Sequence, residues 1–196
     1  MVSAAVLQMS ALTDPTLWIA ALAGGAFGAA IGALPAFIFT GFAVIAGEAL
    51  GIAGEEVVDS GSSITGLIGF GPVFGPHISF AAGAAAAAYA AKQGYMDDGK
   101  NILWAAGTNH IDVLMVGAVF GAIGHLGTSS LRLIGFPTDN IAMLVFLSAL
   151  LHRVVFGYSI IGEVSGNGLF DVGPWERDED DAPGIWLPWQ YKWGNV

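Results

Sequence analysis

Residues 16–52 contain a single charged side chain, Glu48, and this apolar run constrains the fold more than any other feature of the chain. As one continuous helix the run would be about 55 Å long at 1.5 Å per residue, whereas the hydrocarbon core of a bilayer is about 30 Å thick. The run must therefore break, and residues 32–35, with the sequence GALP, are the predicted place. Two alternatives follow: a tight hairpin between helices over 16–33 and 36–53, or one kinked span preceded by a re-entrant or surface-lying piece.

The composition indicates an integral membrane protein. Of 196 residues, 55% are hydrophobic and 11% are charged, and 29 are Gly. These values predict an all-α integral membrane protein of the plasma membrane, a bundle of four to five Gly/Ala-rich transmembrane helices over residues 1–163. The net charge of −10 lies almost wholly outside the apolar runs, which favours a halophilic archaeon as the source. Since the chain has no Cys and no Lys/Arg cluster, thiol chemistry is excluded and nucleic acid is not expected as a partner.

The basic residues predict the orientation. Those on one side of the predicted spans are Lys92, Lys100, Arg177 and Lys192, whereas the loops of the other side carry only Arg132. Because cytoplasmic loops carry the excess of Lys and Arg, we expect a cytoplasmic C-terminus in a multi-pass protein. Residues 164–196 would form an acidic, Trp-rich cytoplasmic tail, for which a protein partner is one interpretation.

Three glycines, Gly24, Gly28 and Gly32, follow one another at intervals of about one helical turn. Such a strip lets another backbone approach closely, which predicts helix packing or homo-oligomerisation through these residues.

A second feature is the Gly- and Pro-broken stretch over residues 69–80, GFGPVFGPHISF, inside an apolar segment. In hydrocarbon, non-helical backbone persists only where protein or a water-filled cavity surrounds it. A helix broken near Gly71 to Pro76 therefore predicts a functional site, with a second half-helix that starts at Gly75-Pro76 and carries His77 and Ser79 in its first turn.

Helical rise then predicts which polar groups meet. His77 would lie about 18 Å below one surface, and His110, in a span over 102–126, about 12 Å above the other, so both reach the midplane. Ionisable residues at that depth cost several kcal/mol unless they pair or face a cavity. His125 is instead predicted at the interface. The candidate pore or substrate site comprises His77, Ser79, Asn109, His110, Asp112, His152, Arg153 and Glu48.

These features predict a channel or transporter for a small ion or polar solute, and not an enzyme. The sign of the solute's charge stays open, because a helix N-terminus favours anions whereas Glu48 and Asp112 favour cations. One alternative is a structural or accessory subunit, with Arg153 paired to Asp112 or Glu48. Another is a haem- or metal-binding protein, with His77, His110 and Asp112 as candidate ligands; the leading expectation is no cofactor.

Overall fold

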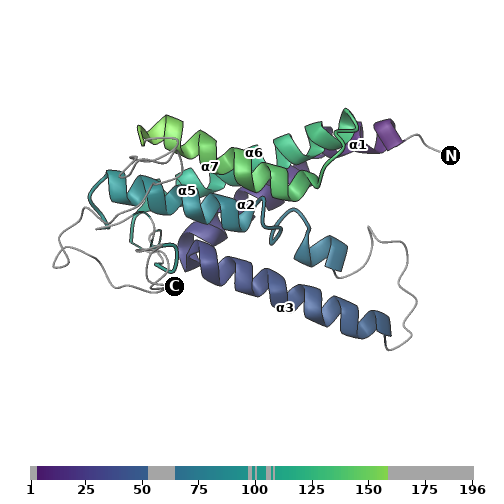
Figure 1. Ribbon diagram of the computed structural model, residues 1–196, viewed down its shortest axis with the longest axis horizontal. Coiled ribbons are helices and arrows are strands. Elements are labelled where there is room, and N and C mark those ends of the chain that lie inside the picture. Colours follow the sequence, from purple (N-terminus) through teal and green to yellow (C-terminus); the bar gives the residue numbers. More distant parts are fainter. Residues whose placement is uncertain are drawn as a thin grey trace, which may run out of the picture. The chain divides into compact units, whose positions relative to one another are not determined.

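A computed structural model of the protein describes residues 4–52, 65–96, 99, 101–104, 107 and 109–158. The chain divides into two compact units, residues 1–152 and 153–196. Every regular element in the described ranges is a helix, which confirms the all-α class. In chain order the helices are α1 (Ala4–Thr13), α2 (Pro15–Ile31), α3 (Ala33–Ile52), η1 (Thr65–Gly69), α5 (Ser79–Lys92), α6 (Ile111–Leu133) and α7 (Asn140–Phe156) (Figure 1).

The predicted boundary after residue 163 and the predicted tail over 164–196 lie outside the described residues. Both therefore stay predictions.

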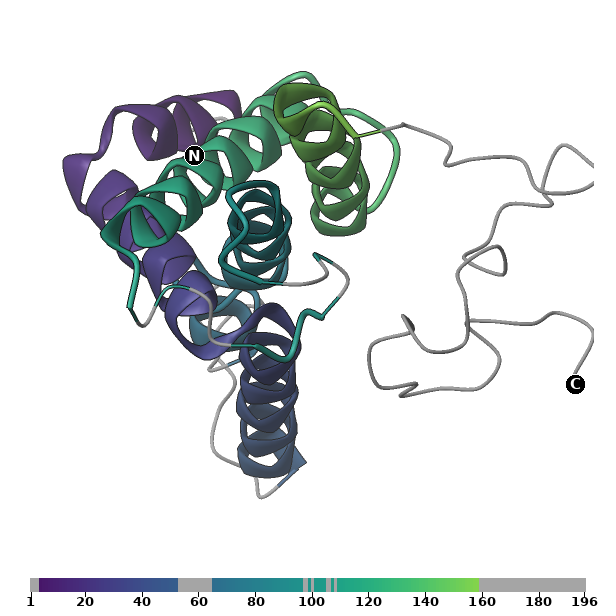
Figure 2. The same ribbon diagram turned by 90° about the vertical axis from the view of Figure 1, so that its left-hand side faces the viewer.

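The apolar run over residues 16–52 breaks where the sequence predicts. Asp14 caps α2 by accepting a hydrogen bond from the N–H of Thr16 at 2.8 Å, and α2 ends at Ile31 because Gly32 adopts a φ of 97°. Beyond this glycine, the ring of Phe39 in α3 contacts that of Phe27 in α2, with centroids 5.9 Å apart. The chain therefore turns at Gly32, and the two helices then diverge (Figure 2). A tight hairpin between two membrane spans stays a prediction.

The predicted break near Gly71 to Pro76 is also confirmed. The single π-helical turn η1 closes with a hydrogen bond from the N–H of Phe70 to the carbonyl oxygen of Thr65, 2.8 Å long. Irregular turns follow, and α5 begins at Ser79 rather than at Gly75-Pro76. The reason is local: the hydrogen bonds to the carbonyl groups before Ser79 are irregular, from the N–H of Ile78 to Gly75 at 2.8 Å and from that of Ala81 to Pro76 at 2.9 Å.

Small residues form the interior. The helices α2, α5 and α6 pack against one another, and the buried apolar residues are mostly Ala. Gly25 of α2 lies against the backbone of Gly117 and Gly121 of α6, so no side chain separates the two helices at this crossing. Such contacts bring whole backbones into van der Waals range, which is how small residues stabilise helix packing.

The glycine strip has a partner within the chain. Gly24 is buried against the backbone of Val73, and Gly28 is buried against that of Ser79, so both glycines receive the broken segment between η1 and α5. Gly32 lies against the backbone of Leu103. These contacts account for the strip without a second copy, and homo-oligomerisation stays a prediction.

The large apolar side chains lie on the outside. On α3, Phe42 is 66% exposed, and on α6, Ile111 is 77% exposed. Two helical segments, Ala33–Leu50 of α3 and the whole of α6, are long and apolar enough to cross a membrane, whereas α2 and α7 are apolar but shorter.

The glycine contacts give a stability prediction. In Gly28→Ala the new Cβ would overlap the carbonyl oxygen of Ser79, so we expect the free energy of unfolding to fall by about 1–3 kcal/mol, as overpacking typically costs. The matched control is Gly41→Ala, in α3, where a Cβ meets nothing within 4 Å. Because alanine has a higher helix propensity than glycine, Gly41→Ala should raise the free energy of unfolding by up to about 1 kcal/mol. Denaturant titration of both variants measures the difference, and equal effects would refute a packing role for Gly28.

Candidate functional site

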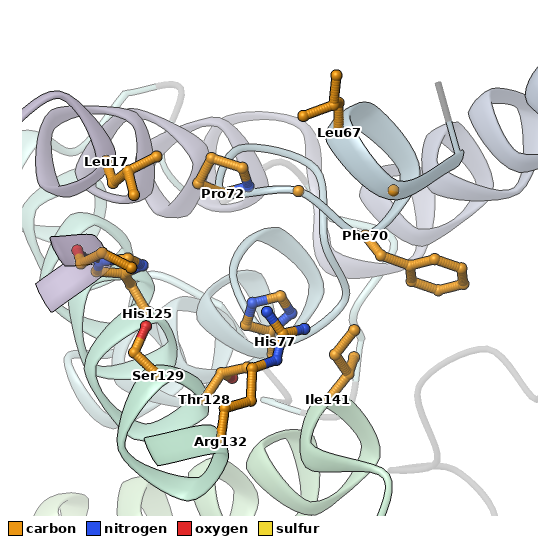
Figure 3. Close-up of a pocket in the computed structure, with 13 residues that line it drawn as sticks. Leu17, Leu67, Phe70, Pro72, His77, His125, Thr128, Ser129, Arg132 and Ile141 are labelled. Carbon is orange, nitrogen blue, oxygen red and sulfur yellow. Dashed lines mark hydrogen bonds between the residues drawn. The ribbon is translucent and has the colours of Figure 1, made fainter. Parts of the chain in front are cut away.

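A pocket of about 420 Å³ lies beside the broken segment. Figure 3 shows its lining, which combines polar side chains with a set of apolar ones. The polar residues are His77, His125, Thr128, Ser129 and Arg132. The other lining residues are apolar or Gly: Ala11, Leu17, Gly66, Leu67, Phe70, Gly71, Pro72 and Ile141.

Among the described lining residues, helix α6 supplies every polar one except His77. Its four polar residues, at positions 125, 128, 129 and 132, recur at the spacing of one face of an α-helix. His125, Thr128 and Ser129 are buried, whereas Arg132, in the last turn of α6, is exposed. The guanidinium group therefore lies at the mouth of the pocket, with the hydroxyl and imidazole groups deeper inside.

The broken segment supplies His77, which is only 5% exposed. A Cβ at Gly75 would come within 2.6 Å of Cε1 of the His77 ring, and a Cβ at Gly124 would overlap the His77 carbonyl oxygen. Two glycines, one before the histidine and one on α6, thus allow the ring to reach its place between the helices. A continuous helix through residues 71–78 would not give the chain this path.

Two buried polar atoms of the lining have no hydrogen-bond partner among the described residues: Nδ1 of His77 and Oγ1 of Thr128. Leaving such an atom unsatisfied costs about 1–3 kcal/mol, so each exception requires an explanation. His125 differs, because its Nε2 lies 3.2 Å from the carbonyl oxygen of Ala11. A carbonyl can only accept, so Nε2 carries the proton. The ring of Trp18 packs edge-on against His125 and fixes its orientation further, with centroids 5.1 Å apart.

The charge of the pocket is one-sided. Arg132 contributes a formal positive charge, and none of the described lining residues is acidic. Asp139 lies close in sequence to the lining residue Ile141, but its Oδ1 accepts the N–H groups of Ile141 and Ala142, at 2.9 and 3.2 Å. That carboxylate therefore caps the start of α7.

The predicted site residues do not assemble around one centre. Among the eight predicted residues, His77 lines the pocket. Ser79, two residues further along the chain, is not in the lining and donates its hydroxyl to the carbonyl oxygen of Phe74 at 3.2 Å. Ser79 thus satisfies backbone that the break leaves free, which is a supporting role.

The predicted meeting of His77 with His110 is wrong. Helix α6 begins at Ile111 rather than at Ile102, and His110 is its N-cap residue. The backbone of His77 contacts Gly124, about 20 Å further along α6 at 1.5 Å per residue. Consequently His77, His110 and Asp112 cannot share a metal ion, and among the described residues no group of three His, Asp or Glu side chains could hold one.

His110 and Asp112 belong instead to a second polar cluster at the start of α6. The Asp112 carboxylate accepts hydrogen bonds from the hydroxyl groups of Tyr89 and Tyr95, each 3.1 Å long. The ring of His110 stacks on that of Tyr95, with centroids 3.8 Å apart, and Asn109 beside it is exposed. This Tyr–Asp cluster ties the end of α5 to the start of α6.

The remaining predicted residues also lie outside the pocket. Glu48 is exposed and accepts the Thr65 hydroxyl at 2.8 Å, which links α3 to η1. The ring of His152, in α7, lies edge-on to that of Phe120 in α6, with centroids 6.3 Å apart. Arg153 is partly buried in the last turn of α7 and begins the second unit.

Sequence reasoning missed Thr128, Ser129 and Arg132 and assigned His125 to the interface. The signal that could have found these residues is their spacing, which places four polar side chains on one face of an otherwise apolar helix. The partner of that face could not be recognised, because His77 comes from a distant segment.

Fold and pocket together define a helical protein in which glycine contacts hold a broken segment against a polar helix face. The chain belongs to a family of unknown function, DUF7973, whose family model matches residues 6–196. Neither the curated proteins nor the solved structures include a match.

The Tyr–Asp cluster gives a titration prediction. The hydrogen bond to Asp112, together with burial and the negative charge of that carboxylate, raises the pKa of Tyr95 above its usual value of 10.0. Asp112→Asn removes the charge, so we expect the pKa of Tyr95 to fall toward that value. Absorbance of tyrosinate against pH measures the change, and Tyr95→Phe identifies the contribution of this residue. An unchanged Tyr95 titration in Asp112→Asn would contradict the cluster.

Proposed function

We propose that this protein is a multi-pass membrane channel or transporter for a small ion or polar solute, with the pocket between the broken segment and α6 as its solute site. The observation that carries the proposal is the placement of polar groups: they face a cavity inside a bundle whose outer surface is apolar.

The distribution of side-chain size supports the membrane. Large apolar residues such as Phe42, Ile45 and Met115 are exposed, whereas the buried apolar residues are mostly Ala. In lipid, helices gain nothing by hiding large apolar side chains, so small residues form the contacts and large ones face the acyl chains. On α3 the exposed residues Ile38, Phe42 and Ile45 recur at helical spacing and so share one face, and an exposed apolar face is typical of contact with lipid or a partner. The plasma membrane is proposed from the composition, and the cytoplasmic C-terminus from the positions of the basic residues.

The broken segment supports a solute site. Irregular backbone at membrane depth requires protein or a water-filled cavity around it, and here it borders a pocket with two buried polar atoms that have no partner among the described residues. Discontinuous helices beside a few polar groups are typical of transporter sites. From Arg132 to His125 the pocket extends about 10 Å along α6, so it opens near one end of this helix and not at its middle.

The alternatives have less support. The haem and metal hypotheses required His77 and His110 at one centre, and the structure separates them by a large part of α6. A structural subunit needs no cavity lined by buried hydroxyl and imidazole groups, because such groups lower stability when nothing binds them.

The proposal predicts membrane integration and flux. We expect the protein to stay with the membrane after alkaline extraction, and proteoliposomes to show protein-dependent flux of some member of a panel of small anions, cations and neutral solutes. His77→Ala should reduce that flux about tenfold or more, because the ring lines the pocket. The matched control is His110→Ala, which changes the same residue type outside the pocket and should leave the flux unchanged.

Release of the protein by alkaline extraction, or no flux across the panel, would refute the proposed function. Equal losses in the two histidine variants would refute the assignment of the pocket.

A further inference from the structure

We infer that the solute of this pocket is a small monocarboxylate, an organic acid whose carboxylate binds at Arg132 and whose hydrocarbon part lies against the apolar wall. This inference rests on the proposed function, because it names the class of solute for the same site.

The charge balance favours a single negative charge. The lining carries one guanidinium group and, among the described residues, no acidic side chain; the carboxylate of Asp139 lies outside the lining, caps α7 and acts on His77 through its charge. A monoanion would neutralise Arg132, whereas a cation would meet repulsion and a dianion would bring an uncompensated charge into a low-dielectric site. The planar guanidinium also matches the two oxygens of a carboxylate.

The hydrogen-bonding groups lie where a carboxylate at Arg132 can use them. Thr128 precedes Arg132 by one helical turn on the same face of α6, and its Oγ1 is buried without a partner among the described residues. Its hydroxyl can donate to an oxygen that the guanidinium also binds. Nδ1 of His77, likewise unpartnered in the described structure, can donate from the tautomer that is protonated there. Both atoms are fully buried in the wall of the pocket, so a carboxylate at Arg132 would reach them only after a small shift of the surrounding side chains.

The rest of the lining favours an organic anion. Leu17, Pro72 and Ile141 contribute apolar atoms to the wall (Figure 3). Leu67 and Phe70 also line the pocket, at its exposed edge. Chloride or a hydrated inorganic oxyanion would leave this wall without contacts. A volume of about 420 Å³ lies within the usual range for small-molecule sites, which is about 300–1,000 Å³.

The test is a binding measurement that does not depend on transport. The thermal unfolding midpoint of the purified full-length protein in detergent is followed against millimolar propionate, with propionamide as the uncharged isostere, at constant ionic strength. Since a ligand that binds the folded state raises the midpoint with concentration, we expect a saturable rise with propionate and none with propionamide. Inorganic phosphate at the same concentrations should have a smaller effect.

Variants assign the binding to the pocket. Arg132→Gln should weaken the affinity for propionate about tenfold or more, and Arg132→Lys should fall between this variant and the natural protein, because it keeps the charge without the bidentate geometry. The matched control is Lys92→Gln, which removes one positive charge at the end of α5, outside the pocket lining, and should bind propionate normally.

A second variant separates binding from folding. Thr128→Val keeps the shape of the side chain and removes a hydroxyl that has no partner among the described residues, so the ligand-free protein should be no less stable. The affinity for propionate should nevertheless fall several-fold. A drop in stability with unchanged affinity would contradict the role given to Thr128.

Three results would overturn the inference: equal effects of propionate and propionamide, unchanged propionate affinity in Arg132→Gln, or stronger binding of phosphate than of propionate. Loss of the propionate effect in nanodiscs that contain phosphatidylglycerol, but not in phosphatidylcholine nanodiscs, would instead assign the pocket to a lipid headgroup. Propionate binding without flux would refute only the proposed function, and flux limited to uncharged solutes would refute only the inference.

Discussion

The contact between glycines and the broken backbone is the constraint on which the rest of the structure depends. Gly24 and Gly28 of α2 and Gly124 of α6 each lie where a Cβ would overlap a carbonyl oxygen of residues 73–79. The segment can therefore lie between two helices instead of outside them. Protein groups satisfy the carbonyl oxygen of Phe74 there, since the hydroxyl groups of Thr40 and Ser79 both donate to it.

Glycine contacts of this kind also decide where larger side chains can lie. Where α6 meets the backbone of α2 or of the broken segment it carries Gly117, Gly121 and Gly124, and beyond this stretch it carries the polar residues of the pocket. Along α6, the glycine contacts with neighbouring backbone are therefore followed directly by the residues that line the pocket. The two unpartnered atoms of the pocket cost stability, whereas the glycine contacts beside the pocket contribute van der Waals attraction.

How much the sequence could predict depended on whether a feature is local. The breaks at Gly32 and near Gly71 to Pro76 were predictable, because backbone geometry and the missing N–H of proline act within a few residues. The position of His110 was not. The predicted depth of His110 in the membrane rests on a helix that begins at Ile102. Helix α6 begins at Ile111, so His110 precedes the helix instead of lying inside it. The polar face of α6 was visible as a spacing, whereas its juxtaposition with His77 depends on tertiary contacts between distant segments.

The position of Arg132 bears on how a pocket of this kind could work in a membrane. A guanidinium group at the bilayer centre is far more costly than one at a helix end, where it keeps contact with water. Arg132, exposed in the last turn of α6, can therefore meet a carboxylate at the pocket mouth before the anion loses its hydration. At the other end of α6, the Tyr–Asp cluster holds α5 and α6 together. In a transporter this cluster would favour joint movement of α5 and α6, because parting them would remove the two tyrosine hydroxyl donors of the Asp112 carboxylate.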